Sequence, residues 1–437
     1  MDSSKLIKLA RKSKFLVRIS KITPAMFLDM MFNGNGYESK SLRLISFHAK
    51  QKHLIELSKQ AIDNRFSNAS IDFAKALIEE ALSTQVRTMI APTVLNLFRT
   101  VRIKDSTIFG IDASLSELFE GFGKGGGRSS KAAVSIQFEY DLKTGNILDI
   151  DLQPAVARDT KDAISKKDDI EKGDLIIRDL GYYSDKMIQH YIKKEAFFIS
   201  KLYHNVAVRI KSEEDKIDFR NLYDQMTTSG LSRQDMVVYI GKAKREVRLI
   251  AELVPESLYQ QRVRRRNQEN KASGYNTSDE FKARAHFNLY ICNIETTDCS
   301  IDSILKLYRM RWQIELMFKI WKSILHIDLM PKMKKERFLT TLYLKLLWVF
   351  LNWQLISDLR NYLYITTNKL LSPYKCFTTI KEMKEQLYDA IFEDKGNFNE
   401  ILEKILENLS VGNWAEKRKG RCNFCEIFDL IFCSSIN

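Results

Sequence analysis

Two aspartates follow apolar segments that have the character of buried strands. Asp112 lies near the end of TIFGIDASL, and Asp179 lies near the end of DLIIRDLGYY. Acidic side chains are depleted in strands and are seldom fully buried unless they are paired or bound to a cation. A helix cap or turn residue is the ordinary alternative, and Asp149 and Asp151 in ILDIDL show that strand acids also occur outside any site. Because Asp112 and Asp179 end core strands of one predicted sheet, we predict that their carboxylates converge.

A third acid lies on a long predicted helix, IDSILKLYRMRWQIELMFKIWKSIL (301–325). At about 100° per residue, Tyr308, Arg311, Glu315 and Lys322 fall within an arc of about 60°, beside an apolar face. Glu315 is therefore a candidate to complete a metal site. Its three neighbours on the arc are candidates to hold phosphates on either side of the bond that is cut. A solvated face with an Arg311–Glu315 ion pair one turn apart is the alternative.

Three convergent carboxylates suit metal-dependent phosphoryl transfer. Two divalent ions roughly 3.5–4 Å apart activate the attacking oxygen and stabilise the leaving oxygen. Mg²⁺ keeps several of its waters, so a few carboxylates and the substrate phosphate complete its shell. We predict two Mg²⁺ ions, with Mn²⁺ as a substitute, bound by Asp112, Asp179 and Glu315.

The charge balance favours a polyanionic partner. The 437 residues carry a formal net charge of +14, and 45% of them are hydrophobic, which is enough for a sizeable core. Nucleic acid is the commonest polyanion, although a basic protein of unrelated function has the same balance. We therefore predict a DNA partner.

The cysteines and the apolar stretches indicate a cytoplasmic protein with no membrane span. Six cysteines in so long a chain are not a disulfide framework, and the CxxC of Cys422 and Cys425 lacks the second ligand pair of a zinc site. The start of the chain has no apolar segment of a signal peptide. The most apolar stretch, 342–356, is shorter than the roughly 20 residues of a membrane span, so we predict a buried helix there.

One candidate DNA contact lies near the N-terminus. SLRLISFHAKQKHLIELSKQAIDNRF has the rhythm of a helix-turn-helix, with Lys59, Gln60 and Arg65 on the polar side of its second helix. Such side chains reach phosphates and base edges from a groove. An ordinary helical hairpin is the alternative.

A second candidate contact is the densest basic run, QQRVRRRNQENKASGYNTSDEFKAR. It contains Arg264, Arg265 and Arg266, which we predict to contact phosphates. A solvated, mobile loop is the alternative.

The order of elements predicts an α/β fold. Three strands in a meander begin at residue 106 and are followed by a helix, a strand, a helix and a strand, which is also the order of the ribonuclease H-like fold. We predict five regions: a helical DNA-binding region (1–103), the first part of the catalytic core (104–201), a mostly β insertion (202–286), the second part of the core (287–355) and a helical C-terminal region (356–437) for dimerisation.

The helix at 301–325 carries a family signature. YRMRWQIELMFKIWK fits Y-x2-R-x3-E-x6-K without a gap and resembles the signature helix of DDE transposases in the insertion-sequence-four family. IFGIDAS and LIIRDLGYYS resemble the segments around the family's first and second catalytic aspartates. HFNLYICNIE resembles the strand before the signature helix, and KSKFLVRISKITPAMFLDMMF with SKQAIDNRF resembles the N-terminal region. The resemblance covers roughly residues 10–355.

The resemblance implies a cut-and-paste transposase with a ribonuclease H-like core interrupted by a mostly β insertion. The family's catalytic, metal-binding acids carry over to Asp112, Asp179 and Glu315. Its DNA-holding residues carry over to Tyr308, Arg311 and Lys322. It also implies a homodimer that acts on paired terminal inverted repeats and on target DNA. Such a protein works in the bacterial cytoplasm and joins the nucleoid when bound to DNA.

One departure concerns the hairpin intermediate of the family. Hairpin-forming members hold a flipped base on an aromatic residue, often a tryptophan near the end of the insertion. This chain has no tryptophan between 202 and 311, and Phe287 is the candidate in its place. A core phenylalanine is the alternative, so the hairpin route stays open.

Two rival functions share these features. A ribonuclease H-like nuclease would cut DNA without rejoining it, and an inactive relative would only bind DNA. A nucleotide-driven enzyme is a weaker rival, because GFGKGGGRSS (121–130) does not place its lysine as a phosphate-binding loop does and lies between strands. We predict no use of ATP.

Overall fold

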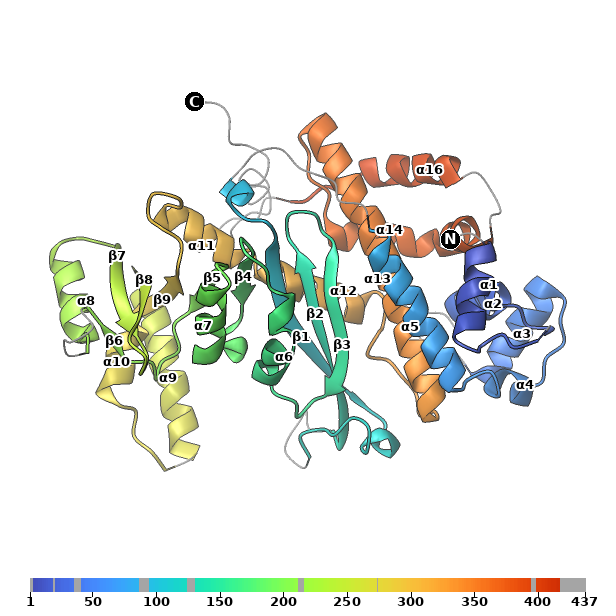
Figure 1. The fold of residues 1–437 in the computed structure, drawn as a ribbon, viewed down its shortest axis with the longest axis horizontal. Coiled ribbons are helices and arrows are strands. Elements are labelled where there is room, and N and C mark those ends of the chain that lie inside the picture. Colours follow the sequence, from blue (N-terminus) through green and yellow to red (C-terminus); the bar gives the residue numbers. More distant parts are fainter. Residues whose placement is uncertain are drawn as a thin grey trace. The chain divides into compact units, whose positions relative to one another are not determined.

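The chain divides into two compact units, and strand β1 (Val101–Ile111) contributes to both. Figure 1 labels the helices and strands and colours them along the sequence. The computed structural model describes these stretches of the chain: 3–18, 20–34, 41–85, 94–123, 130–210, 216–272, 274–393 and 398–416. The first unit is drawn from three segments: 1–90, 106–157 and 312–429. The second unit is drawn from 91–105, 158–311 and 430–437.

The N-terminal part of the first unit is helical. Its helices are α1 (Ser3–Lys12), α2 (Pro24–Asp29), the π-helix η1 (Met30–Gly34), α3 (Leu42–His53), α4 (Lys59–Asp63) and α5 (Asn68–Ser83). Hydroxyl side chains start three of them, since Thr23, Ser41 and Ser58 each accept a hydrogen bond from the amide three residues on. The pair α3–α4 occupies the segment in which we predicted a helix-turn-helix.

The C-terminal part of the first unit is also helical. Its helices are α12 (Trp312–Ser323), α13 (Lys335–Thr367), α14 (Pro373–Glu382), α15 (Lys384–Tyr388), the π-helix η6 (Asp389–Glu393) and α16 (Phe398–Ser410). Helix α13 packs against α5, where the hydroxyls of Ser70 and Thr340 lie 2.7 Å apart. In the described part of the chain, α13 alone is long and apolar enough to cross a membrane, but 72% of its apolar window is buried within the structure. Such burial is typical of a core helix.

A β-hairpin completes the first unit. Strands β2 (Ala132–Asp141) and β3 (Ile147–Pro154) pair antiparallel, and every residue of β2 is buried. Phe138 of β2 packs its ring edge-on against Trp321 of α12 at 4.9 Å and lies 6.4 Å from Phe350 of α13. These two helices therefore cover the hairpin. A 3₁₀ turn, η3 (Ala113–Leu115), follows β1.

The second unit contains the rest of the sheet. Its other strands are β4 (Leu175–Arg178), β5 (Phe197–Lys201), β6 (Val208–Arg209), β7 (Arg233–Ile240), β8 (Arg245–Leu253) and β9 (Phe287–Cys292). The sheet has nine strands in the order β3-β2-β1-β4-β5-β9-β8-β7-β6. Strands β1, β4 and β5 are parallel to one another, and β9, β8, β7 and β6 continue antiparallel. The fold is therefore a mixed α/β structure, as predicted.

Helices and short turns connect these strands. The helices are α6 (Asp159–Ser165), α7 (Asp185–Lys193), α8 (Phe219–Thr228), α9 (Glu256–Ala272), α10 (Asp279–Ala285) and α11 (Ile301–Arg309). The 3₁₀ turns are η2 (Val94–Leu97), η4 (Lys167–Asp169) and η5 (Leu180–Tyr182). Apolar side chains such as Val238, Leu249 and Ile291 form the core under the antiparallel strands.

The segment 202–286 differs from the mostly β insertion that the sequence predicted. Besides β6, β7 and β8 it holds helices α8, α9 and α10. Helix α9 escaped prediction because it is polar on all sides and lacks the apolar stripe by which an amphipathic helix is recognised.

The predicted helix 301–325 is two helices. Helix α11 ends at Arg309 and α12 begins at Trp312, with a turn between them. In this turn the amide of Arg311 donates to the carbonyl of Tyr308, three residues back instead of four. The rotation of about 100° per residue therefore does not carry across Arg311, so the shared arc predicted for Tyr308 and Glu315 is wrong.

Three sequence features lie outside the described residues. They are most of the glycine-rich segment 121–130, the CxxC of Cys422 and Cys425, and the end of the C-terminal region 356–437. The predictions made for them stay predictions.

Candidate active site

Two aspartates lie side by side where β1 runs along β4. The register pairs Lys104 of β1 with Arg178 of β4, so the next residues on the two strands are Asp105 and Asp179. Strand β4 is buried over its whole length, and the chain then turns into η5, at whose start Asp179 stands. The side chain of Asp179 is 47% exposed and that of Asp105 is 18% exposed. Two carboxylates thus meet at the solvent-accessible end of a core strand.

Arg311 joins these two carboxylates. Its Nη1 donates to Oδ2 of Asp105 at 2.9 Å, and its Nε lies 3.9 Å from Oδ1 of Asp179. Neighbouring carboxylates repel each other, and a cation held between them offsets that repulsion. The guanidinium is one such cation, and a divalent metal ion is another. Arg311 itself comes from the turn between α11 and α12.

Tyr308 is buried beneath this group. Its side chain is 6% exposed, and its ring packs edge-on against Tyr290 at 5.1 Å. The Nζ of Lys201 lies 5.9 Å from the ring centroid. Burial raises the pKa of the Tyr308 hydroxyl, so that group stays protonated. The predicted DNA contact of Tyr308 is at odds with a hydroxyl that is shielded from solvent.

Asp112 stands at the start of the 3₁₀ turn η3. Its Oδ1 accepts hydrogen bonds from the amide and the hydroxyl of Ser114, at 3.0 and 2.5 Å, which caps η3. These bonds lower the pKa of the Asp112 carboxyl. Asp112 follows Asp105 by seven residues and lies just beyond the end of β1 at Ile111. The structure thus contains the cap that we held as the alternative, and the strand register places Asp105, not Asp112, next to Asp179.

Glu315 and Lys322 both belong to α12. Glu315 is exposed in the first turn of this helix, four residues after Arg311. Lys322 donates from Nζ to the carbonyl of Ile108 on β1 at 3.0 Å. Both side chains therefore lie within the first unit, as Asp112 does, whereas Asp105 and Asp179 belong to the second unit.

Comparisons with known proteins identify the family. A profile of the transposase DDE domain matches residues 96–351. The transposase of insertion sequence element IS1151 from Clostridium perfringens is 28% identical over 451 residues, which cover 98% of this chain and 94% of that relative. The transposases of IS231B and IS231F, from Bacillus thuringiensis subspecies berliner and israelensis, are 26% and 27% identical, each over 86% of this chain and 82% of the relative.

The chain belongs to the DDE transposase family. The resemblance drawn from the signature helix is thereby confirmed, and the protein is a DNA transposase that depends on a divalent metal ion. The profile spans β1, β4, β9 and α12, the elements that carry Asp105, Asp179 and Glu315 or lead to them.

Asp105 is the residue of this transposase that the sequence reasoning missed. The predicted acids stand at strand ends, whereas Asp105 lies inside β1, which begins at Val101 and not at residue 106 as predicted. The signal available was the polar triplet Asp-Ser-Thr (105–107) within an otherwise apolar strand. The register that brings Asp105 beside Asp179 is a tertiary fact that one sequence does not show.

The donor set beside Asp179 fits the metal that the family implies. Carboxylate oxygens are the ligands that Mg²⁺ and Mn²⁺ prefer, and two of them face a shared cation here. Within the described residues, Asp29, His48 and His53 form the one group of three or more His, Cys, Asp or Glu whose ligand atoms all lie within 4.8 Å of one another. None of the acids predicted from the sequence is in that group.

Phe287 is a core residue of the insertion. It is 3% exposed at the start of β9, and its ring packs edge-on against Phe219 and Tyr223. A base needs an open aromatic face for stacking. The structure thus contains the core phenylalanine that we held as the alternative.

The predicted N-terminal DNA contacts separate into two kinds. Lys59 and Gln60 are exposed on the first turn of α4. Arg65 instead donates from Nη2 to the carbonyl of Ile22 at 2.8 Å, and its guanidinium lies 4.9 Å from the ring centroid of Phe15. Burial lowers its pKa. Arg65 thus supports the fold, and Lys59 and Gln60 keep their place as candidates.

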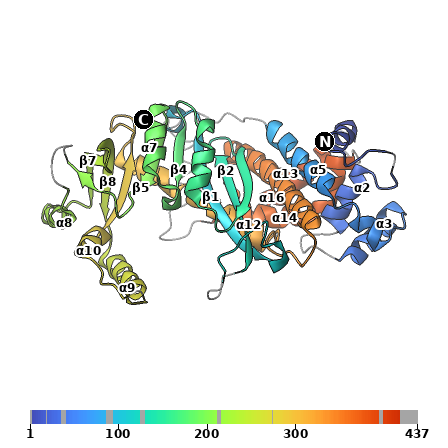
Figure 2. The ribbon, with the colours of Figure 1, turned by 60° about the horizontal axis from the view of Figure 1, so that its bottom comes forward.

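The basic run of the insertion is the helix α9, which projects from the antiparallel strands of its unit (Figure 2). Arg262 anchors the helix by donating to the carbonyls of Ala285 and Phe287 at 3.1 and 2.7 Å. Arg264 is exposed, and Arg265 is 81% exposed beside Glu269. Arg266 is partly exposed, with its guanidinium 5.4 Å from the ring centroid of Phe281.

Proposed function

We propose that this transposase excises and integrates an insertion sequence by metal-dependent phosphoryl transfer at terminal inverted repeats. The observation that carries the proposal is the pair Asp105 and Asp179 on adjacent parallel strands with Arg311 between them. An enzyme that cuts DNA needs a clustered set of carboxylates at an accessible edge, and this pair has both properties.

Asp105, Asp179 and Glu315 are the proposed metal ligands, with Asp105 in place of Asp112. When bound, two Mg²⁺ ions supply activation of the attacking oxygen and stabilisation of the leaving oxygen. Arg311 orients the Asp105 carboxylate through its 2.9 Å hydrogen bond. Such partners of ligating carboxylates fix the direction in which the ligand oxygens point.

The proposed core is ribonuclease H-like. An antiparallel β3-β2 pair beside the parallel strands β1, β4 and β5 supports this, since it matches the meander followed by alternating helices and strands. We retain the five predicted regions as the domain organisation, with 202–286 as a mixed α/β insertion. The region 356–437 keeps its proposed role in dimerisation.

The proposed DNA contacts are basic and exposed. Lys322 and Arg311 would hold phosphates near the cut, and Arg264, Arg265 and Arg266 on α9 would track the backbone of the terminal repeat. Lys59 and Gln60 on α4 would reach a groove. We further propose a homodimer that pairs two inverted repeats in the bacterial cytoplasm and uses no ATP.

A joining assay tests the function. Purified full-length protein is incubated with a labelled duplex that carries one terminal inverted repeat, a supercoiled target plasmid and Mg²⁺. A transposase nicks the duplex and joins the freed 3′ end to the plasmid, whereas a nuclease yields cut duplex alone. Cutting without any joined product would refute the proposed integration.

The matched variants Asp105→Asn and Asp112→Asn test the site in the same assay. We expect Asp105→Asn to abolish nicking and joining and Asp112→Asn to retain both, because only the first removes a ligand. If Asp112→Asn abolished both reactions and Asp105→Asn retained them, Asp112 would be the metal ligand.

A further inference from the structure

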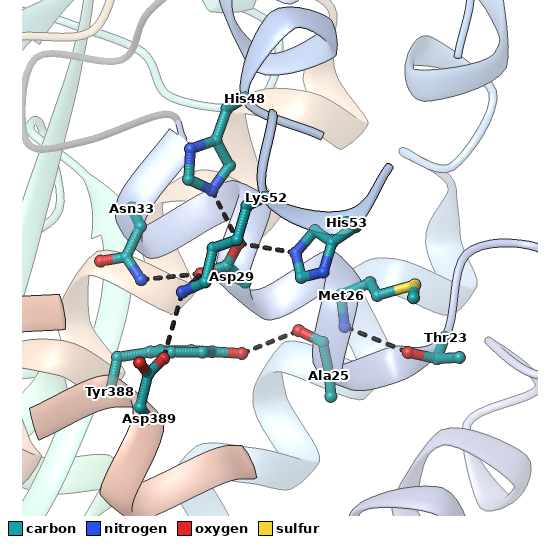
Figure 3. Close-up of polar contacts among 10 residues, drawn as sticks. All are labelled: Thr23, Ala25, Met26, Asp29, Asn33, His48, Lys52, His53, Tyr388 and Asp389. Carbon is teal, nitrogen blue, oxygen red and sulfur yellow. Dashed lines mark hydrogen bonds and ion pairs between the residues drawn. The ribbon is translucent and has the colours of Figure 1, made fainter. Parts of the chain in front are cut away.

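A second polar cluster lies in the first unit, centred on Asp29 at the C-terminus of α2 (Figure 3). The Asp29 side chain is wholly buried. Its Oδ2 lies 2.7 Å from Nε2 of His48 and 2.7 Å from Nε2 of His53. Its Oδ1 accepts hydrogen bonds from Asn33 at 2.7 Å and from Lys52 at 2.9 Å. Both imidazole rings point from α3 toward one carboxylate oxygen.

Local structure holds these groups in place. Helix α2 continues directly into the π-helix η1. Such helices are rare in proteins overall, and those that occur are often found at functional sites. At Gly34, the last residue of η1, an added Cβ would lie 2.8 Å from Cδ2 of His48. Only glycine therefore lets the His48 ring approach η1 this closely. The two histidines, from one helix, meet Asp29 from another.

We propose that Asp29, His48 and His53 bind one divalent transition-metal ion of the zinc class. Their three ligand atoms all lie within 4.8 Å of one another. Two imidazole nitrogens and one carboxylate oxygen are a donor set that suits zinc and its neighbours, whereas Mg²⁺ prefers oxygen alone. This site lies apart from the carboxylates of the proposed active site and does not depend on the proposed function.

The two distances from Asp29 to the histidines would change little on binding an ion. Ligand bonds of about 2.0–2.2 Å in a tetrahedral site separate neighbouring ligand atoms by about 3.3 Å. Oδ2 of Asp29 and each Nε2, now 2.7 Å apart, would move apart by a few tenths of an ångström. Each neutral imidazole would carry its proton on Nδ1, which leaves the Nε2 lone pair for the ion.

The surroundings of Asp29 resemble the support of a metal ligand. Asn33 and Lys52 hold Oδ1, so that Oδ2 stays directed at the two histidines. Lys52 also donates to Asp389 at 3.1 Å, which offsets the ammonium charge near a bound cation. Tyr388 donates to the carbonyl of Ala25 at 2.7 Å, so the C-terminal helices brace α2 as well.

The alternative is that Asp29 and its neighbours form a hydrogen-bonded cluster that binds no ion. The two oxygens of Asp29 already accept four hydrogen bonds, which is about the full capacity of a carboxylate. In that account His48 and His53 donate from Nε2, and zinc has no effect on them. The two accounts differ in what the purified protein does with the metal alone.

Metal binding by the full-length protein separates these accounts. The protein is stripped with a chelator and titrated with Zn²⁺ alone, and with Co²⁺ for its visible absorption. We expect one equivalent of tightly bound ion, a raised melting temperature, and loss of both effects in His48→Gln and His53→Gln. His190→Gln is the matched control, since that histidine lies on α7 and bonds the carbonyl of Lys167. It should bind as the unaltered protein does.

Two further variants exclude other binding sites. Asp105→Asn removes a proposed active-site ligand, and the double change Cys422→Ser with Cys425→Ser removes the sequence's CxxC. Both should retain the equivalent of zinc. Loss of zinc in either one, with retention in His48→Gln, would overturn the proposal.

A measurement on the unaltered chain covers the case in which the histidine variants do not fold. Cu²⁺ is added at one equivalent and its electron paramagnetic resonance spectrum is recorded. Coupling to two imidazole nitrogens supports the site. A spectrum without nitrogen coupling, or the absence of stoichiometric binding, refutes it.

Discussion

Two carboxylate clusters in this chain show how neighbours decide what an aspartate does. Asp179 is 47% exposed and shares a guanidinium with Asp105, whereas Asp29 is wholly buried among two imidazoles, an amide and an ammonium. Oxygen-only ligands at an accessible edge suit Mg²⁺ and a phosphate substrate. Mixed nitrogen and oxygen ligands in a buried place suit a structural ion.

The comparison also separates activity from stability. An exposed carboxylate can be replaced without leaving buried groups unsatisfied, whereas a buried one leaves every donor around it unpaired. Substitutions at Asp179 should therefore reduce catalysis and spare the fold. Substitutions at the Asp29 cluster should reduce the free energy of unfolding.

The largest effect is expected at Asp179. The change Asp179→Ala should reduce the nicking rate by about 1,000-fold or more, a loss typical of removing a group that acts on transition-state charge. Single-turnover assays with a labelled terminal repeat measure it, and the urea midpoint should stay near that of the unaltered protein. A large fall in the midpoint would make Asp179 a structural residue.

The opposite pattern is expected at Asp29. The change Asp29→Ala should destabilise the protein by about 3–5 kcal/mol, because it leaves the Lys52 ammonium and three other donors without the carboxylate that accepts from them. Urea denaturation followed by circular dichroism measures the loss. Asp112→Ala is the control, since that carboxylate is a solvent-exposed cap, and it should cause a much smaller loss. Equal losses for the two variants would contradict the contrast.

Arg311 tests the support of the active-site pair. The change Arg311→Gln should reduce activity by about 10–100-fold and raise the Mg²⁺ concentration needed for half-maximal rate, as loss of a ligand's hydrogen-bonding partner does. Arg309→Gln is the control, because that neighbouring arginine lies 3.9 Å from Glu252 and outside the pair. An unchanged Mg²⁺ requirement in Arg311→Gln would show that Arg311 does not support the metal ligands.

Gly34 tests the packing of the Asp29 cluster. The change Gly34→Ala places a methyl group against the His48 ring and should cost about 1–3 kcal/mol, the usual range for overpacking a core. Thermal unfolding with and without Zn²⁺ measures the cost and any loss of the zinc effect. A variant as stable as the unaltered protein would show that His48 moves aside freely.

The smallest effect is expected on α9. Replacing Arg264 or Arg265 with alanine should weaken binding of any duplex and lower the slope of log affinity against log salt by about 0.9 for each phosphate that is no longer neutralised. Fluorescence anisotropy across a salt series measures this. Lys172→Ala, at a surface ion pair with Glu195, is the control and should leave the slope unchanged. A change confined to one DNA sequence would instead indicate base recognition.

The sequence predicted what depends on local pattern. The strand before Asp179 and the buried helix around 342–356 both followed from apolar runs. These features are set by neighbours along the chain, so one sequence suffices to find them.

The features that the sequence did not predict depend on contacts between residues far apart in the chain. Asp105 stands beside Asp179 only because β1 and β4 pair with Lys104 opposite Arg178. The Asp29 cluster joins residues 19 and 24 positions apart that share no recognisable motif. Helix α9 has no apolar stripe, and Phe287 is indistinguishable in sequence from an exposed aromatic residue.

The central claim is that Asp105 and Asp179 hold the catalytic metal ions. Crystals of the full-length protein soaked in Mn²⁺ and measured at the manganese absorption edge test it most directly. The account predicts an anomalous peak within about 2.0–2.3 Å of carboxylate oxygens of both residues. A peak bound by Asp112, with none beside Asp105, would contradict it.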